Sequence, residues 1–234
     1  MSSTASLESM CCKHRAKTAK TSEILDRPSL VVIIDCWNNQ EHDHYLATLN
    51  NIRHFCETNI NVQSIAVASY IGLDNKIFAK EEPWWGNGYE LFYNTTRWET
   101  LRQVWNETRF QLDHLTHPII QGIVKRSDQT QFIMWHSLQT LYYCNHINPA
   151  IENIFIVGQS WDHCLEFRSV GWKELDNLNT YNLFDKKKTI LSKKDCVTGV
   201  NNSVVNNVSL PWVELDDQYL MLDSNIWKDM PQPY

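Results

Sequence analysis

The sequence has no surplus of basic residues and no apolar run that approaches the length of a membrane span. Its 21 lysines and arginines are outnumbered by 27 acidic residues, and the net charge is −6. A protein that binds nucleic acid generally needs the opposite balance to neutralise phosphates, so we expect no nucleic-acid partner. A membrane-spanning helix needs about 20 consecutive apolar residues, so we expect a soluble protein with no membrane partner.

The sequence also lacks the cysteine pattern of a disulfide-rich protein. Its seven cysteines are odd in number and include no C-x-x-C pair. This pattern predicts reduced thiols and therefore a cytoplasmic protein. No internal repeat, low-complexity stretch or linker divides the body of the chain. With 234 residues and 43% hydrophobic residues, the chain is typical of one large globular domain.

Short apolar runs alternate with amphipathic segments along most of the chain. Runs typical of buried strands lie at 30–34, 62–70, 119–124, 154–157 and 189–192. Apolar residues recur at helical spacing over 44–57, 132–142 and 164–171. Strands that alternate with helices predict an α/β fold, with three α/β/α layers around a mostly parallel, doubly wound sheet.

Three parts of the chain fall outside this alternation. Residues 1–28 have no apolar period and predict a disordered N-terminal tail. Residues 29–200 form the predicted domain, and a long insertion at 72–118 interrupts it. Residues 201–234 are a C-terminal extension that we expect to pack on the domain; within it, 212–222 is a final strand, a hairpin or a surface segment.

Asp35, Lys125 and Cys164 each follow a predicted buried strand directly or after a tight turn. The carboxyl ends of parallel strands share one edge of a sheet, so we expect these three residues to converge. A free thiol has a pKa of about 8.5, and a nearby ammonium group or helix amino end stabilises its thiolate. A carboxylate can accept the thiol proton and later return it to a leaving amine. The pattern therefore favours a cysteine nucleophile with Asp35 as base and then acid, although a small buried thiol and a salt bridge at the sheet edge remain the alternatives.

These residues lie in motifs that resemble the isochorismatase-like cysteine hydrolases. The matching segments, in the family's order, are VVIIDCWNN at 31–39, IVKRSDQTQF at 123–132 and GQSWDHC at 158–164. The resemblance implies a catalytic triad of Asp35, Lys125 and Cys164. It also implies a cis peptide between Gln159 and Ser160, and an oxyanion hole made by the backbone N–H groups of Ser160 and Cys164.

The same resemblance bears on the reaction. The metal-binding branch of the family carries histidines after its second strand, and 70–80 contains none, so we expect no metal and no other cofactor. A cysteine at 164 fits hydrolysis of a small-molecule amide, carbamoyl or related C–N bond through a thioester. The aromatic residues near the motifs suggest a pocket for a flat or apolar substrate group, lined by Trp37, Trp161, Trp84 and Trp85.

The resemblance further implies a homo-oligomer, a dimer or a tetramer. A different reading of the sequence is a catalytically inactive member of the family with a binding or assembly role. The 72–118 insertion, the loop at Trp37 and the C-terminal extension would then be its interaction surfaces.

Overall fold

The computed structural model describes residues 20–38, 42–68, 116–123, 129–134, 137–161, 164–168, 170–199 and 211–223. The strands are β1 (Ser29–Ile34), β2 (Val62–Ala68), β3 (Thr130–Met134), β4 (Asn153–Gln159), β5 (Thr189–Lys193), β6 (Val197–Thr198), β7 (Trp212–Glu214) and β8 (Tyr219–Leu222). The helices are α2 (Asp43–Thr58), α6 (Pro118–Gln121), α7 (Ser137–Tyr142), α8 (Cys164–Phe167) and α9 (Trp172–Thr180). A π-helical turn, η1 (Tyr143–Ile147), and a 3-10 turn, η2 (Lys194–Cys196), complete these elements.

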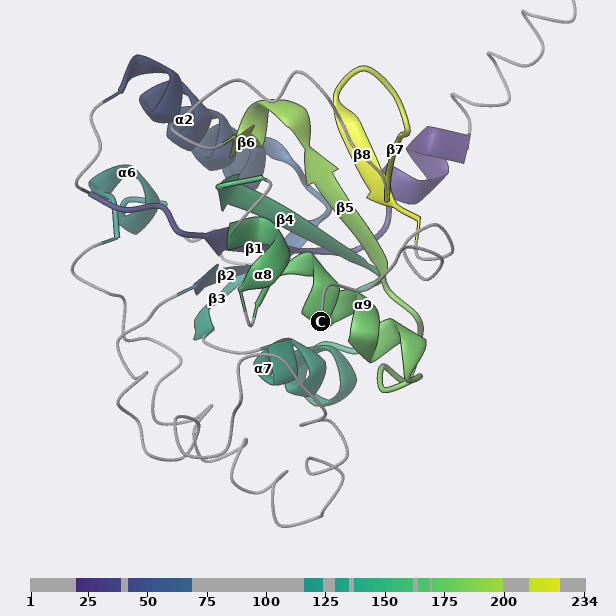
Figure 1. Cartoon of the computed structure of the whole chain (residues 1–234). Helices are drawn as coiled ribbons and strands as arrows, with labels where there is room; N and C mark the ends of the chain where they lie inside the picture. The colour runs from purple at the N-terminus through teal and green to yellow at the C-terminus, as the bar shows by residue number, and fades with distance from the viewer. Residues whose placement is uncertain are drawn as a thin grey trace, which may run out of the picture.

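The described residues form a mixed α/β fold around a mostly parallel, eight-stranded sheet (Figure 1). The strand order is β3-β2-β1-β4-β5-β8-β7, and β6 pairs with β4 beside β5. β1 lies between β2 and β4 and is parallel to both. The predicted α/β class with a mostly parallel sheet is thus confirmed.

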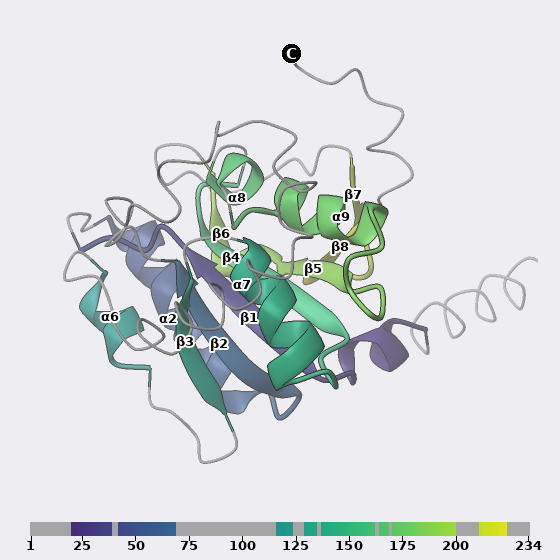
Figure 2. The ribbon, with the colours of Figure 1, turned by 90° about the horizontal axis from the view of Figure 1, so that it is seen from below.

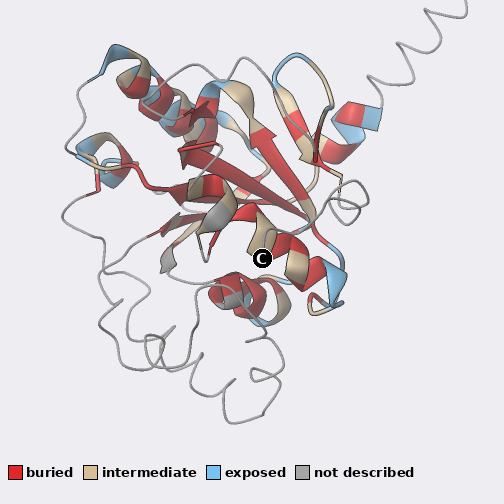
Figure 3. Cartoon of the chain, in the orientation of Figure 1, coloured by how far each residue is buried: buried red, intermediate tan, exposed pale blue. Residues whose placement is uncertain are grey.

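The core lies on both sides of β1, whose six residues are all buried. Successive side chains of a strand point to opposite faces. Leu30 and Val32 accordingly join the cluster under α7, α8 and α9, whereas Val31 and Ile33 join the cluster under α2 and α6. Figure 3 shows this burial along the central strands. A strand buried on both faces reads as a continuous apolar run, which is why the sequence identified it.

The strand predicted at 119–124 is wrong, because Pro118–Gln121 forms α6. The N-cap residue His117 accepts a hydrogen bond at Nδ1 from a backbone N–H of the first turn, and Pro118 supplies a backbone angle that suits that turn. The third strand is instead β3, which pairs with β2 in parallel. The helical spacing predicted from Phe132 therefore begins only with α7. A short apolar run does not by itself distinguish a strand from a helix.

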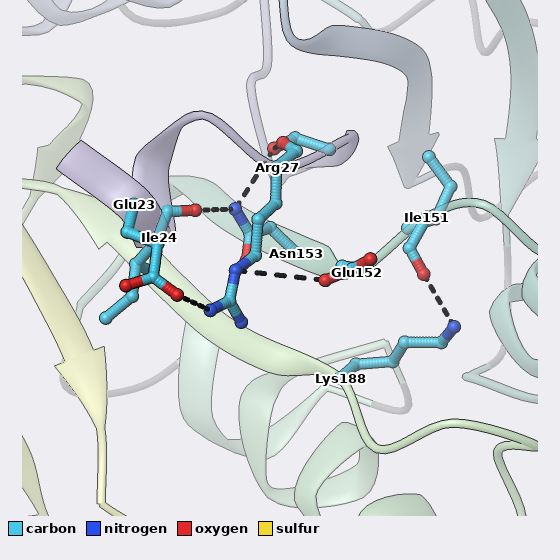
Figure 4. A network of polar contacts seen from close by, with 8 residues as sticks. Glu23, Ile24, Arg27, Ile151, Glu152, Asn153 and Lys188 are labelled. Carbon is cyan, nitrogen blue, oxygen red and sulfur yellow. Dashed lines mark hydrogen bonds and ion pairs between the residues drawn. The ribbon is translucent and has the colours of Figure 1, made fainter. Parts of the chain in front are cut away.

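The predicted N-terminal tail is wrong in its last part. Residues 20–25 are helical, and Ile24 is buried in the core under α2. The Ile24 carbonyl accepts a hydrogen bond of 2.7 Å from the Asn153 side chain, and Arg27 bridges Glu23 and Glu152 (Figure 4). These contacts hold the segment against the amino end of β4, so the ordered domain begins earlier than predicted. Residues 1–19 of that prediction lie outside the described residues.

Within the predicted C-terminal extension at 201–234, residues 211–223 contribute strands to the sheet rather than packing on it, and the rest lies outside the described residues. β7 and β8 form an antiparallel hairpin, and β8 pairs with β5 in the antiparallel direction. This confirms the hairpin among the predicted alternatives for 212–222 and moves the domain boundary past residue 200. Nearly all of the predicted 72–118 insertion, namely residues 72–115, lies outside the described residues.

None of the helices in the described ranges combines the length and the apolar character that crossing a bilayer requires.

Gly158 sets the distance between β1 and β4 at the carboxyl edge of the sheet. It pairs with Ile34 and has a φ of 117°, in a region that side-chain-bearing residues rarely adopt. A Cβ at this position would lie 2.1 Å from the Ile34 carbonyl oxygen. Only glycine therefore lets the two strand ends approach this closely.

The Gly158→Ala variant should lose roughly 2–5 kcal/mol of unfolding free energy, from backbone strain and from displacement of Ile34. Urea unfolding followed by circular dichroism measures this loss. Gly122→Ala is the matched control: there a Cβ would meet its nearest neighbour, the Pro118 carbonyl oxygen, at 3.2 Å, so the loss should stay below about 1 kcal/mol. Equal losses in the two variants would contradict this account of Gly158.

Candidate functional site

The candidate site lies where the strand order of the sheet reverses. The chain runs from β1 outward to β2 and β3, and then returns to β4 on the other side of β1. Open α/β sheets bind ligands at the carboxyl ends of the strands at such a point. Asp35 follows β1 directly, and the turn after β4 leads to Cys164 at the start of α8. α8 packs beside β4, as the second view also shows (Figure 2).

Asp35 is almost completely buried, with a side chain 2% exposed. Its φ of 53° lies in the left-handed region, which turns the chain sharply as it leaves β1. The Arg168 Nε and Nη2 atoms both lie 2.9 Å from the Asp35 Oδ2 atom. The other carboxylate oxygen, Oδ1, is buried and has no hydrogen-bond partner of ordinary geometry in the described part of the chain. Asp35 is therefore held by one oxygen and keeps an acceptor at the other.

Cys164 is partly buried and interacts with Asp35. Burial raises the pKa of the Cys164 thiol to about 11, and Asp35 contributes both as a nearby negative charge and as a hydrogen-bond acceptor. The Ser160 backbone N–H and the Arg168 charge act in the opposite direction and lower this pKa. The sequence motifs predict a stabilised thiolate. The described surroundings instead favour the protonated thiol, because burial and the adjacent carboxylate outweigh the two stabilising groups.

The turn between β4 and α8 supplies backbone groups to the sulfur. The Gln159–Ser160 peptide is cis, at the position that the family resemblance implies. The Ser160 N–H donates to the Cys164 sulfur, and the Ser160 carbonyl accepts a hydrogen bond of 3.0 Å from the Leu165 N–H. The Ser160 N–H thus lies against the Cys164 sulfur. The oxyanion hole of Ser160 and Cys164 stays a prediction.

Lys125 lies outside the described residues, and the segment before it, Pro118–Gln121, is a helix instead of the predicted strand. It was expected to follow a strand, but α6 precedes it and β3 comes after it in the chain. Its convergence with Asp35 and Cys164 remains a prediction. The argument that Lys125 lies at the carboxyl end of a strand no longer supports it. Trp135 and His136 directly follow β3, and they too lie outside the described residues.

The predicted pocket residues have different surroundings. Trp37 is partly exposed, and its carbonyl accepts a hydrogen bond of 2.9 Å from the Tyr45 hydroxyl. Trp161 is buried in the core, with its ring centroid 4.9 Å from that of Trp212 in β7. Trp84 and Trp85 lie outside the described residues. A substrate pocket lined by these four residues stays a prediction.

Arg168 is a site residue that the sequence analysis missed. The apolar spacing of 164–171 predicts a helix but does not single out Arg168, the one cation in that stretch. Arg168 stands four residues after Cys164, a separation that places two side chains on the same face of a helix. That spacing is the signal that could have identified it.

Across the described ranges, no three His, Cys, Asp or Glu side chains gather in a way that could hold a metal ion. The segment on which the sequence analysis based its expectation of no metal, 70–80, lies outside those ranges.

The pH dependence of Cys164 alkylation tests the electrostatics of the site. Because the pKa of the thiol is about 11, the labelling rate by iodoacetamide should rise about tenfold per pH unit from pH 8 to 10 without a plateau. The Asp35→Asn variant removes a negative charge that disfavours the thiolate, so its profile should move to lower pH. Peptide mass spectrometry of the Cys164 peptide measures both profiles. A plateau of the unmodified protein below pH 8 would contradict the raised pKa.

Comparison of this chain with protein-family models, with curated proteins and with solved structures finds no match. The family resemblance therefore rests on the three motifs alone, and the function has to be inferred from the geometry at the ends of β1 and β4.

Proposed function

We propose that the protein is a metal-independent cysteine hydrolase that cleaves an amide, carbamoyl or related C–N bond of a small molecule. The observation that carries the proposal is the contact between Asp35 and Cys164 at the carboxyl edge of the sheet. These residues are far apart in the sequence. Their interaction pairs a nucleophile with a proton acceptor, which is the minimum that covalent catalysis requires.

The protonation state of the thiol gives Asp35 a defined task. With a pKa of about 11, only about one thiol in ten thousand is ionised at pH 7. The nucleophile therefore has to lose its proton as it attacks. Asp35 Oδ1, which is buried and lacks an ordinary hydrogen-bond partner among the described residues, is an available acceptor for that proton.

The proposed reaction has two halves. In the first, Asp35 takes the thiol proton while the Cys164 sulfur bonds to the carbonyl carbon, and the backbone N–H groups of Ser160 and Cys164 hold the oxyanion. The C–N bond then breaks, the amine leaves with the proton from Asp35, and the acyl group stays as a thioester. In the second half, water attacks the thioester carbon, Asp35 accepts a water proton, and the C–S bond breaks. The proton returns to sulfur, and a carboxylic or carbamic acid is released.

Other parts of the proposal follow from the family resemblance. Lys125 would activate the thiolate, and Trp37, Trp161, Trp84 and Trp85 would line the pocket. The fold would be the three-layer α/β/α arrangement with a doubly wound sheet, which the reversal of strand order between β1 and β4 supports. The protein would form a homo-oligomer and act in the cytoplasm. The odd number of cysteines and the lack of a C-x-x-C pair support a reducing compartment.

The second candidate function is a catalytically inactive protein of the same fold with a binding or assembly role. One observation favours it: the surroundings of Cys164 raise the pKa of the thiol, whereas a reactive cysteine usually has a lowered pKa. The two candidates differ in whether a carboxylate-assisted acyl transfer to Cys164 takes place.

Trapping of an acyl-enzyme separates the two candidates. We expect incubation with a panel of small amides and carbamoyl compounds to give a thioester adduct, visible by intact-protein mass. The adduct should disappear in Cys164→Ser and persist in Cys144→Ser, the matched control at a buried thiol elsewhere in the core. Failure of every compound to form an adduct or turn over would favour the binding protein.

The role of Asp35 requires a separate comparison. Asp35→Asn should slow amide turnover by roughly 10²- to 10⁴-fold, because the leaving amine loses its proton donor. The same substitution should accelerate iodoacetamide labelling, because that reaction needs only the thiolate. Equal effects of Asp35→Asn on the two rates, measured side by side, would show that Asp35 is not the general acid and base.

A further inference from the structure

Arg168 connects the two candidate catalytic residues. Its Nε and Nη2 atoms both contact the Asp35 Oδ2 atom, and its charge lowers the pKa of the Cys164 thiol. The Arg168 side chain is 29% exposed, whereas that of Asp35 is 2% exposed. Hydrogen-bonded charge pairs in such a setting are stronger than surface pairs, because water competes less for the buried partner.

The backbone of Arg168 is fixed relative to Cys164. The Arg168 N–H donates to the Cys164 carbonyl at 3.2 Å, one helical turn earlier, and the Arg168 carbonyl accepts from the Gly171 N–H at 2.7 Å. Gly171 packs closely against the end of this turn: a Cβ there would lie 2.7 Å from the Leu165 carbonyl oxygen and 3.0 Å from that of Arg168. The backbone of Arg168 is therefore held close to that of Cys164.

Arg168 contacts only one of the two oxygens of the Asp35 carboxylate. Both guanidinium nitrogens bind Oδ2, so Oδ1 remains an acceptor. A guanidinium has only donors and does not release its proton in proteins, so it can orient Asp35 without competing for the thiol proton. This division suits a carboxylate that is held at one oxygen and transfers a proton at the other.

We propose that Arg168 is the positioning residue of this site: it fixes Asp35 through Oδ2 and supplies the positive charge beside the Asp35–Cys164 pair. The proposal rests on the proposed hydrolase function and deepens it. It gives Arg168, one helical turn after Cys164, a cationic role beside the one that the family resemblance implies for Lys125. The lowering of the thiol pKa by Arg168 is consistent with this role.

Alkylation of Cys164 by iodoacetamide at pH 9 tests the proposal without a substrate. Arg168→Gln removes the charge and should lower the labelling rate about tenfold, which corresponds to a rise of about one unit in the pKa of the thiol. Arg168→Lys keeps the charge and should restore the rate to within about threefold of the unmodified protein. A merely structural role predicts no such difference between Lys and Gln. Equal rates for the two variants, or a faster rate for Arg168→Gln, would overturn the proposal.

Two further variants serve as controls. Arg27→Gln removes an arginine of similar exposure, 34%, whose ion pairs lie at the amino end of β4, and should leave the labelling rate unchanged (Figure 4). A decrease would show a general effect of arginine removal and count against the proposal. Lys125→Gln compares the two candidate cations directly. The proposal requires a larger decrease for Arg168→Gln than for Lys125→Gln, and the reverse order would overturn it.

Arg168→Gln leaves the buried Asp35 unpaired, so the variant can fail to fold. In that case the Asp35→Asn, Arg168→Gln double variant replaces it and is compared with Asp35→Asn alone. Slower labelling in the double variant supports the proposal, and equal labelling overturns it.

The failure of this proposal and the failure of the hydrolase function are distinguishable. Labelling requires no turnover, so a missing acyl-enzyme together with the expected Arg168 series would refute the hydrolase and leave the charge arrangement intact. An acyl-enzyme that forms while Arg168→Gln labels at the unmodified rate would refute the role of Arg168 alone.

Discussion

The site depends on the close contact between the ends of β1 and β4. Gly158 faces Ile34 across these strands, and the space between their backbones does not admit a Cβ. Asp35 follows β1 immediately after this contact, and the turn that contains Ser160 follows β4. The separation of the carboxylate and the sulfur is therefore set by a backbone contact in the sheet. A substitution that widened this contact would change the distance between the Asp35 carboxylate and the Cys164 sulfur without touching either side chain.

The charges at the site act against one another. Burial and Asp35 favour the neutral thiol, whereas the Ser160 N–H and Arg168 favour the thiolate. The neutral form prevails, and this bears on the proposed mechanism, in which a protonated thiol would need a base when it attacks. Arg168 favours the thiolate through its positive charge. It also forms an ion pair with Asp35, the carboxylate that disfavours the thiolate. The Asp35–Arg168 pair thus acts on the charge balance at the candidate site as well as on the fold.

Much of the sheet could be predicted from the sequence. The strand prediction failed around 119–134. β1 and β4 were recognised because both faces of these strands are buried, which leaves an uninterrupted apolar run. The inner face of α2 was recognised because Tyr45, Leu49 and Ile52 recur at helical spacing. Around 119–134 neither the apolar run nor the helical spacing of apolar residues was decisive, because a proline-initiated helix and a short strand have similar apolar content. The assignment of Lys125 to a strand end failed with that strand.

The sequence by itself determined the alternation of strands and helices and the chemical types at two strand ends, Asp35 and Cys164. These features are local, because they depend on which side chains a short segment must bury. Only the tertiary structure decided that Arg168 binds Asp35, that the thiol is protonated, and that residues 20–25 and the β7–β8 hairpin belong to the domain. The burial and the electrostatic environment of a site depend on segments far apart in the chain, so they cannot be read from any one segment.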